Sequence, residues 1–277
     1  MTIVIGRKFG NRILLMSDTL ITDLHQVRHH KLPGRLKAIV LGPNLSIAFA
    51  GDAELGLGLV RDAKVQLRDG ASTPEVVQRL TTKCGELSGL CEFLIASHDP
   101  DAVLRKVTAN GLSQPVSGAV IGDQEFLKLL PNYSKAAGDD EFAESGGAVE
   151  RELMNAFNYI FLARRGELPD GVGGVPITLL ASPLGHTYQA CSSAFSWDVI
   201  DLKVGVTDDQ LYDQISGMTE WRYSIQCPTQ RGSAVVSLYL PQARAGYVFD
   251  PINFDEPIHH PDISQHDFEQ AVMNRTS

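Results

Sequence analysis

Apolar positions in the first fifty residues fall in short runs that flank two turn signals, Gly10-Asn11 and Gly42-Pro43-Asn44. Proline presets φ in the second turn, and asparagine tolerates turn geometry in both. Short β-branched and aliphatic runs on either side of a turn are typical of antiparallel strand pairs. The pattern predicts strands at residues 2–8, 13–18, 37–41 and 45–50, and a polar loop at residues 23–34.

After residue 51 the apolar period changes from two to about four. Leucine and alanine recur at near-fourfold spacing between residues 55 and 67, which predicts a helix that opens at Asp52 and ends at Gly70. Ser72 and Pro74 then provide the capping hydroxyl and the first-turn proline of a second helix. A helix pair therefore follows the first strands.

The rest of the chain repeats this order of strand blocks and helical stretches. Helices grouped between strand hairpins favour an α+β fold over a parallel βαβ fold, and a sandwich of two antiparallel sheets with a helix pair on each outer face fits the order. The predicted strands are residues 93–97, 103–108, 116–121, 177–181, 187–191, 202–206, 234–240 and 246–249, and the predicted helices are residues 124–130, 149–164, 207–218 and 266–272.

Composition excludes several classes of protein. With 277 residues, 43% hydrophobic and 21% charged, the chain has the values of an ordinary globular protein. No apolar run reaches the roughly 18 residues of a membrane helix, and a net charge of -9 argues against a nucleic-acid partner. The four cysteines form no Cys-x-x-Cys pair and are interpreted as reduced core thiols. The N-terminus lacks the pattern of a signal peptide, so we expect a cytoplasmic protein.

Thr2 is the first residue to suggest chemistry. The chain contains no G-x-S-x-G elbow, Walker lysine loop or H-E-x-x-H motif. Initiator methionine is removed most readily when the next residue is small, and threonine qualifies. The mature chain would then begin with a hydroxyl and a free α-amine on one residue, a nucleophile and a base that can take its proton.

Several further segments accompany this N-terminal threonine. They are Thr2-Ile3-Val4-Ile5-Gly6, Ile13-Leu14-Leu15-Met16-Ser17-Asp18-Thr19, Lys37 ahead of Gly42-Pro43-Asn44-Leu45, Ala48-Phe49-Ala50-Gly51-Asp52-Ala53-Glu54, Gly118-Ala119-Val120-Ile121-Gly122 and Asp170-Gly171-Val172-Gly173-Gly174. With these segments the chain resembles the β-subunits of the proteasome, in the N-terminal nucleophile (Ntn) hydrolase superfamily. It is more similar to bacterial proteasome-related proteins, of the Anbu type or a neighbouring subfamily, than to the eukaryotic subunits. The resemblance is specific over residues 2–60, looser to about residue 205 and absent afterwards.

The resemblance implies a role for four residues. Thr2 matches the nucleophile, and Asp18, sixteen residues later, matches the aspartate that orients a lysine. Lys37 matches that lysine, whose positive charge favours ionisation of the hydroxyl, although Lys31 is an alternative because the preceding loop is longer. Gly51 matches the glycine whose N–H stabilises the oxyanion. The structural alternatives are a strand-end carboxylate, a solvated lysine and a plain strand-to-helix turn.

Two later positions depart from the family pattern. After Gly122 the family places a serine near the nucleophile, whereas this chain has Asp123. Asp170 matches a supporting aspartate, but Gly173 stands where the family has serine. A carboxylate at position 123 would hold the α-amine in its protonated form if it faced the amine. These departures bear on activity more than on fold.

The resemblance implies a four-layer αββα sandwich and a threonine-type peptidase that acts on proteins or peptides. It implies assembly into a homo-oligomeric ring or spiral, with no metal or organic cofactor. A catalytically silent structural subunit and an amidase for small molecules remain alternatives. Residues 1–220 are interpreted as the Ntn-hydrolase core, residues 221–250 as further strands of that domain and residues 251–277 as a polar tail.

Overall fold

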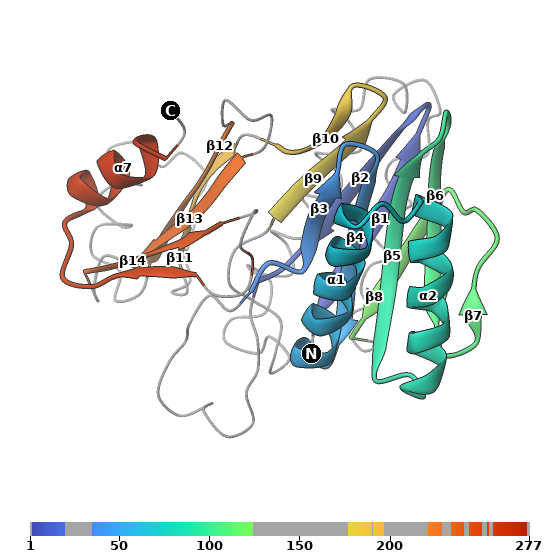
Figure 1. The fold of residues 1–277 in the computed structure, drawn as a ribbon. Helices are drawn as coiled ribbons and strands as arrows, with labels where there is room; N and C mark the ends of the chain where they lie inside the picture. The colour runs from blue at the N-terminus through green and yellow to red at the C-terminus, as the bar shows by residue number, and fades with distance from the viewer. Residues whose placement is uncertain are drawn as a thin grey trace, which may run out of the picture.

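The chain folds as a mixed α+β protein with three antiparallel sheets among the residues described (Figure 1). The computed structural model describes residues 2–19, 35–123, 177–189, 191–196, 221–228, 234–240, 244–250, 254 and 257–275. No helix in these ranges is long and apolar enough to span a membrane.

Sheet A carries the N-terminus. Its strands run in the order β10-β9-β2-β1-β8, with neighbouring strands antiparallel. The hairpin of β1 and β2 turns at Gly10, whose φ of 52° favours glycine. The strands are β1 (Ile3–Phe9), β2 (Arg12–Ser17), β8 (Gly118–Gly122), β9 (Ile177–Ser182) and β10 (Gly185–Tyr188).

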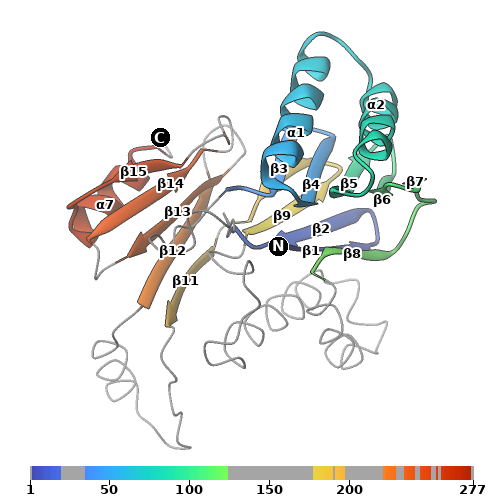
Figure 2. The same ribbon diagram turned by 90° about the horizontal axis from the view of Figure 1, so that it is seen from below.

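Sheet B has the order β3-β4-β5-β6-β7, so its strands follow one another in the chain. Helices α1 (Ala53–Arg68) and α2 (Thr73–Glu86) connect β4 to β5 and cover one face of this sheet (Figure 2). The strands are β3 (Ala38–Gly42), β4 (Leu45–Gly51), β5 (Cys91–His98), β6 (Ala102–Thr108) and β7 (Gly111–Leu112).

The two helices begin where the sequence predicts. The Asp52 side chain accepts the Leu55 N–H at 3.0 Å, and Ser72 forms a capping box with Glu75. Gly56 allows α1 to lie directly on the sheet, because a Cβ at this position would overlap the Phe49 ring.

Sheets A and B pack face to face, so that helices, sheet B and sheet A form successive layers (Figure 2). A Cβ on Gly6 of β1 would lie 3.0 Å from Leu94 and 3.2 Å from Leu104. The sheets therefore lie close together at Gly6, where the interface is apolar.

Sheet C lies beside these layers (Figure 1) and has the order β11-β12-β13-β14-β15. Tyr247 and Phe249 on one face join the main core, while Val248 on the other face packs with Phe268 of helix α7 (Gln265–Met273). The strands are β11 (Cys191–Ser196), β12 (Trp221–Pro228), β13 (Ala234–Leu240), β14 (Ala245–Phe249) and β15 (Ile258–His260).

The predicted α+β class, the two N-terminal strand pairs and the first helix pair are confirmed. Sequence analysis did not predict that β11 to β15 form a third sheet beside sheets A and B. The strand predicted at 187–191 is present as the hairpin partner of β9, but with earlier bounds: β10 covers Gly185–Tyr188, and Cys191 begins β11. Strand β12 was missed although Trp221, Tyr223 and Ile225 alternate with polar residues.

Several predicted segments lie outside the described residues. They are the loop at 23–34, the helices at 124–130, 149–164 and 207–218 and the strand at 202–206. The helix predicted at 266–272 is confirmed as α7, and β15 is an additional strand in the same C-terminal segment. The division into a core, further strands and a tail stays a prediction.

Candidate active site

Thr2 lies at the start of β1, where the end of β8 holds its backbone. Only 4% of its surface is exposed. Its carbonyl oxygen accepts the backbone N–H of Asp123 at 2.9 Å, and the next residue, Ile3, pairs with Gly122. The position of the candidate nucleophile therefore depends on a strand more than a hundred residues away in the sequence.

Asp18 is brought beside Thr2 by the β1–β2 hairpin. Val4 pairs with Ser17, so the residue that follows β2 lies across from the start of β1. The Asp18 Oδ1 atom accepts the backbone N–H of Ile3 at 3.1 Å. The hairpin geometry expected from the sequence spacing is thus present, and a buried carboxylate contacts the residue next to Thr2.

Lys37 comes to the same place from sheet B. Its Nζ atom lies 3.0 Å from both Asp18 carboxylate oxygens, and both side chains are fully buried. Its backbone oxygen accepts the N–H of Phe49 at 2.9 Å, which aligns it with β4. Burial lowers the pKa of the Lys37 ammonium, and the Asp18 carboxylate acts against this shift. The ion pair joins the two sheets at the Thr2 end of their interface.

Gly51 ends β4 immediately before α1 and is exposed. Its φ is 111°, and a Cβ would overlap the Leu90 carbonyl oxygen, so only glycine fits. Phe49 donates its N–H toward β3, and Asp52 donates its N–H to Leu90 of the chain leading into β5. Because strand N–H groups alternate in direction, the N–H of Gly51 lies on the β3 side of β4, the side of Lys37.

Gly122 and Asp123 close the site from β8. Gly122 has a φ of 110°, and a Cβ here would overlap the Thr2 carbonyl oxygen. Glycine is therefore required for β8 to lie this close to Thr2. Asp123 is 6% exposed, next to the backbone of Thr2. A carboxylate thus occupies the neighbourhood in which the family pattern has serine.

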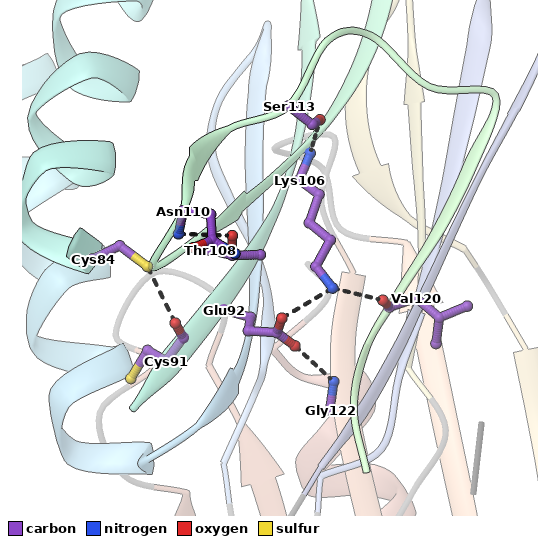
Figure 3. Close-up of polar contacts among 9 residues, drawn as sticks. All are labelled: Cys84, Cys91, Glu92, Lys106, Thr108, Asn110, Ser113, Val120 and Gly122. Atoms are coloured by element: carbon purple, nitrogen blue, oxygen red, sulfur yellow. Dashed lines mark hydrogen bonds and ion pairs between the residues drawn. The ribbon is translucent and has the colours of Figure 1, made fainter. Parts of the chain in front are cut away.

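A second ion pair, within sheet B, lies next to Gly122 of sheet A (Figure 3). The Nζ atom of Lys106 on β6 lies 2.9 Å from Glu92 Oε1 on β5. The other carboxylate oxygen of Glu92 accepts the Gly122 N–H at 3.4 Å, and Lys106 donates to the Val120 carbonyl oxygen at 3.4 Å. Sequence analysis did not identify either residue.

Two buried cysteines support the junction of β4 and α1. Cys84 of α2 donates its thiol to the Cys91 carbonyl oxygen at 3.1 Å (Figure 3), and Cys91 donates its own to the Asp52 carbonyl oxygen at 3.4 Å. Burial raises the pKa of both thiols, that of Cys91 to about 11. Both are free thiols, as predicted, and their protonated state makes them structural groups rather than nucleophiles.

A third polar cluster lies at the opposite end of the interface between the sheets. The Ser46 Oγ atom is 2.8 Å from His186 Nδ1, and His186 Nε2 is 2.8 Å from His98 Nδ1. His98 Nε2 lies 3.1 Å from the Asn11 carbonyl oxygen. Because a carbonyl only accepts, two neutral histidines must each carry hydrogen on Nε2, and Ser46 then donates to His186. Ser46 is 0% exposed, so the cluster ties the sheets together and offers no nucleophile to a substrate.

Of the six residues singled out from the sequence, the structure links four by hydrogen bonds: Asp123 to Thr2, Asp18 to the neighbour of Thr2, and Lys37 to Asp18. Gly51 lies at the end of β4, on the side of Lys37. Asp170 lies outside the described residues, as do Gly173 and the alternative lysine, Lys31. Within the described ranges, no group of three His, Cys, Asp or Glu side chains is arranged to hold a metal ion.

Comparison of the chain with protein-family models gives no match, and comparison with curated proteins gives no significant match either.

Proposed function

We propose that the chain is a threonine-type peptidase subunit of a self-assembling, proteasome-like complex, with the four-layer αββα fold of Ntn hydrolases. The observation that carries the proposal is the Asp18–Lys37 pair: Asp18 binds both the ammonium of Lys37 and the N–H of Ile3, the neighbour of Thr2. Asp18 thereby links the Lys37 side chain to the residue that follows Thr2, whose hydroxyl and α-amine would stand on one residue after removal of Met1.

The proposed reaction needs only groups of this chain and water. The Thr2 hydroxyl oxygen attacks the carbonyl carbon of a peptide bond, and the α-amine of Thr2 takes the hydroxyl proton. Lys37 favours the developing alkoxide through its positive charge, and the N–H of Gly51 donates to the oxyanion of the tetrahedral intermediate. The proton passes to the leaving amine, and water then hydrolyses the ester on Thr2 to release the acid.

Asp123 supports a second candidate function, that of a catalytically silent subunit of the same assembly. Its backbone binds Thr2 and its side chain is buried nearby. A carboxylate that faced the amine would keep it protonated, and a protonated amine cannot accept the hydroxyl proton. The two functions make opposite predictions for hydrolysis by the purified protein.

The test compares wild type with Thr2→Ala and Thr2→Ser on a panel of fluorogenic peptides and small-molecule amides. A peptidase cleaves the peptides, Thr2→Ala loses about 10³-fold or more of the activity, and Thr2→Ser keeps a measurable part of it. Circular dichroism and size-exclusion profiles should be unchanged, because the start of a strand tolerates alanine. Cleavage of small amides alone would replace the peptidase with an amidase, and no cleavage by wild type would favour the silent subunit.

A further inference from the structure

Strand β8 ends sheet A in the part of the chain that the structure describes, and its outer edge faces away from β1. The Asp123 N–H points inward, to the Thr2 carbonyl oxygen. Because backbone groups alternate along a strand, Val120 and Gly122 point their N–H and C=O groups outward. An outward-facing edge needs partners for these groups if it is to be held in place.

Glu92 and Lys106 provide two such partners with matched polarity (Figure 3). Glu92, an acceptor, meets the Gly122 N–H, and Lys106, a donor, meets the Val120 carbonyl oxygen, each at 3.4 Å. The two side chains also bind each other at 2.9 Å and are only 26–27% exposed. Together they imitate the donor and acceptor that a further strand would present to this edge.

The place of Glu92 in sheet B connects this edge to both halves of the candidate site. Glu92 pairs with Ala50, and the preceding residue, Cys91, pairs with Gly51. From the other side, Gly122 precedes the residue that binds Thr2. Glu92 of sheet B therefore contacts β8 where β8 holds Thr2, and it lies one residue along β5 from the partner of Gly51.

We propose that Glu92, supported by Lys106, is a positioning residue that holds the Gly122–Asp123 end of β8 and thereby sets the distance between Thr2 and Gly51. The expected effect of Glu92 on turnover rests on the proposed function, whereas its effect on the position of β8 does not. Glu92 does not touch the reacting atoms in this account. It acts through the backbone of Gly122, and Lys106 fixes the orientation of its carboxylate.

The ion pair by itself is a weak candidate for this role, because partly exposed salt bridges contribute little to stability. The proposal instead depends on the direction of the hydrogen bonds to the edge of β8. A variant that keeps the ion pair but reverses its polarity separates the two explanations. In Glu92→Lys/Lys106→Glu, a donor would face the Gly122 N–H and an acceptor would face the Val120 carbonyl.

The experiment uses the full chain and compares four variants with wild type. Glu92→Leu removes the acceptor, Glu92→Gln keeps an acceptor without the charge, and the reversed pair keeps the charges with the wrong polarity. Glu86→Leu is the control, because Glu86 forms an exposed ion pair with Lys83 on α2 at 2.7 Å, away from β8. The readouts are amide hydrogen exchange at Gly122 and Asp123 by NMR, and kcat and KM for a cleaved peptide.

We expect exchange at Gly122 to rise at least about tenfold in Glu92→Leu and in the reversed pair, because a hydrogen bond to a charged group is lost. We expect kcat to fall by a similar factor in both variants, because displacement of Thr2 from Gly51 weakens stabilisation of the transition state. KM should change less than about twofold, because substrate binding is not affected. Glu92→Gln should recover most of kcat, and Glu86→Leu should behave as wild type.

Two results overturn the positioning proposal: wild-type exchange at Gly122 in Glu92→Leu, or full recovery of kcat by the reversed pair. The exchange measurement does not require catalytic activity. It therefore tests whether Glu92 holds the end of β8 even if the chain is catalytically silent. A wild-type chain that starts with Thr2 and cleaves nothing would instead overturn the proposed function.

Discussion

Lys37 Nζ lies 3.0 Å from both carboxylate oxygens of Asp18, although the two residues belong to different sheets. Asp18 follows β2 of sheet A, and Lys37 precedes β3 of sheet B. Neither side chain is exposed. The same carboxylate also accepts the Ile3 N–H, so one buried group orients the lysine and holds the start of β1.

Lys37→Ala should cut turnover strongly, whereas Lys31→Ala should leave it near wild type. Lys37→Ala also leaves the Asp18 carboxylate buried without its cation, which lowers the free energy of unfolding by roughly 3–5 kcal/mol. Chemical denaturation should show this loss. The double variant Asp18→Leu/Lys37→Met carries no unpaired charge and should recover much of the stability but none of the activity. An essential Lys31 and a dispensable Lys37 would show that the lysine of the site lies in the preceding loop.

Gly122→Ala should displace Thr2 or prevent folding, because its Cβ would overlap the Thr2 carbonyl oxygen. Gly10→Ala is the matched control: Gly10 also has a positive φ, of 52°, but no atom lies within 4 Å of its Cβ position. The control should lose only about 1–2 kcal/mol, the cost of a left-handed backbone conformation. Equal effects of the two substitutions on the unfolding free energy would contradict the close approach of β8 to Thr2.

Asp123→Ser should raise the rate of hydrolysis if the Asp123 carboxylate faces the α-amine of Thr2. Removing a nearby negative charge favours the neutral amine, so the rise of kcat with pH should move to lower pH. The pH–rate profile of the two proteins measures this shift. An unchanged profile with a lower Tm would show that Asp123 has a structural role only.

The His98–His186 cluster should make the fold sensitive to acid. Burial and the neighbouring His98 lower the pKa of His186 to about 4, whereas an unfolded histidine titrates near 6.5. Between these values the unfolded chain binds more protons, so stability falls as pH falls from 6.5 to 4, by up to about 3 kcal/mol. Urea denaturation at several pH values measures the slope. His186→Leu should flatten it, and an unchanged slope in that variant would show that another group is responsible.

Contacts within a hairpin were predictable from the sequence, and contacts between sheets were only partly so. The turn at Gly10 and the spacing from Thr2 to Asp18 fix a local geometry that the structure confirms. The link from Glu92 to Gly122 spans 30 residues and that from His98 to His186 spans 88. Both depend on how two sheets stack, which no local pattern specifies.

A sequence signal for these cross-sheet groups does exist in β5. Alternate residues of this strand, from Glu92 through Leu94 and Ala96 to His98, share one face. The two polar members lie at the ends and the apolar members in the middle, and the structure shows this arrangement at the interface of sheets A and B. The pattern indicates a polar group at each end. Lys106 lies on β6 of the same hairpin, whereas the cross-sheet partners Gly122 and His186 come from sheet A and required the fold.

The central claim is that Thr2 becomes the N-terminal residue and acts as the nucleophile, and intact-mass measurement with and without a threonine-directed electrophile tests it most directly. We predict that the purified chain lacks Met1, gains the mass of one inhibitor, and carries the adduct on Thr2 in peptide maps, whereas Thr2→Ala gains none. A chain that retains Met1, or an adduct that maps to another residue, would contradict the account.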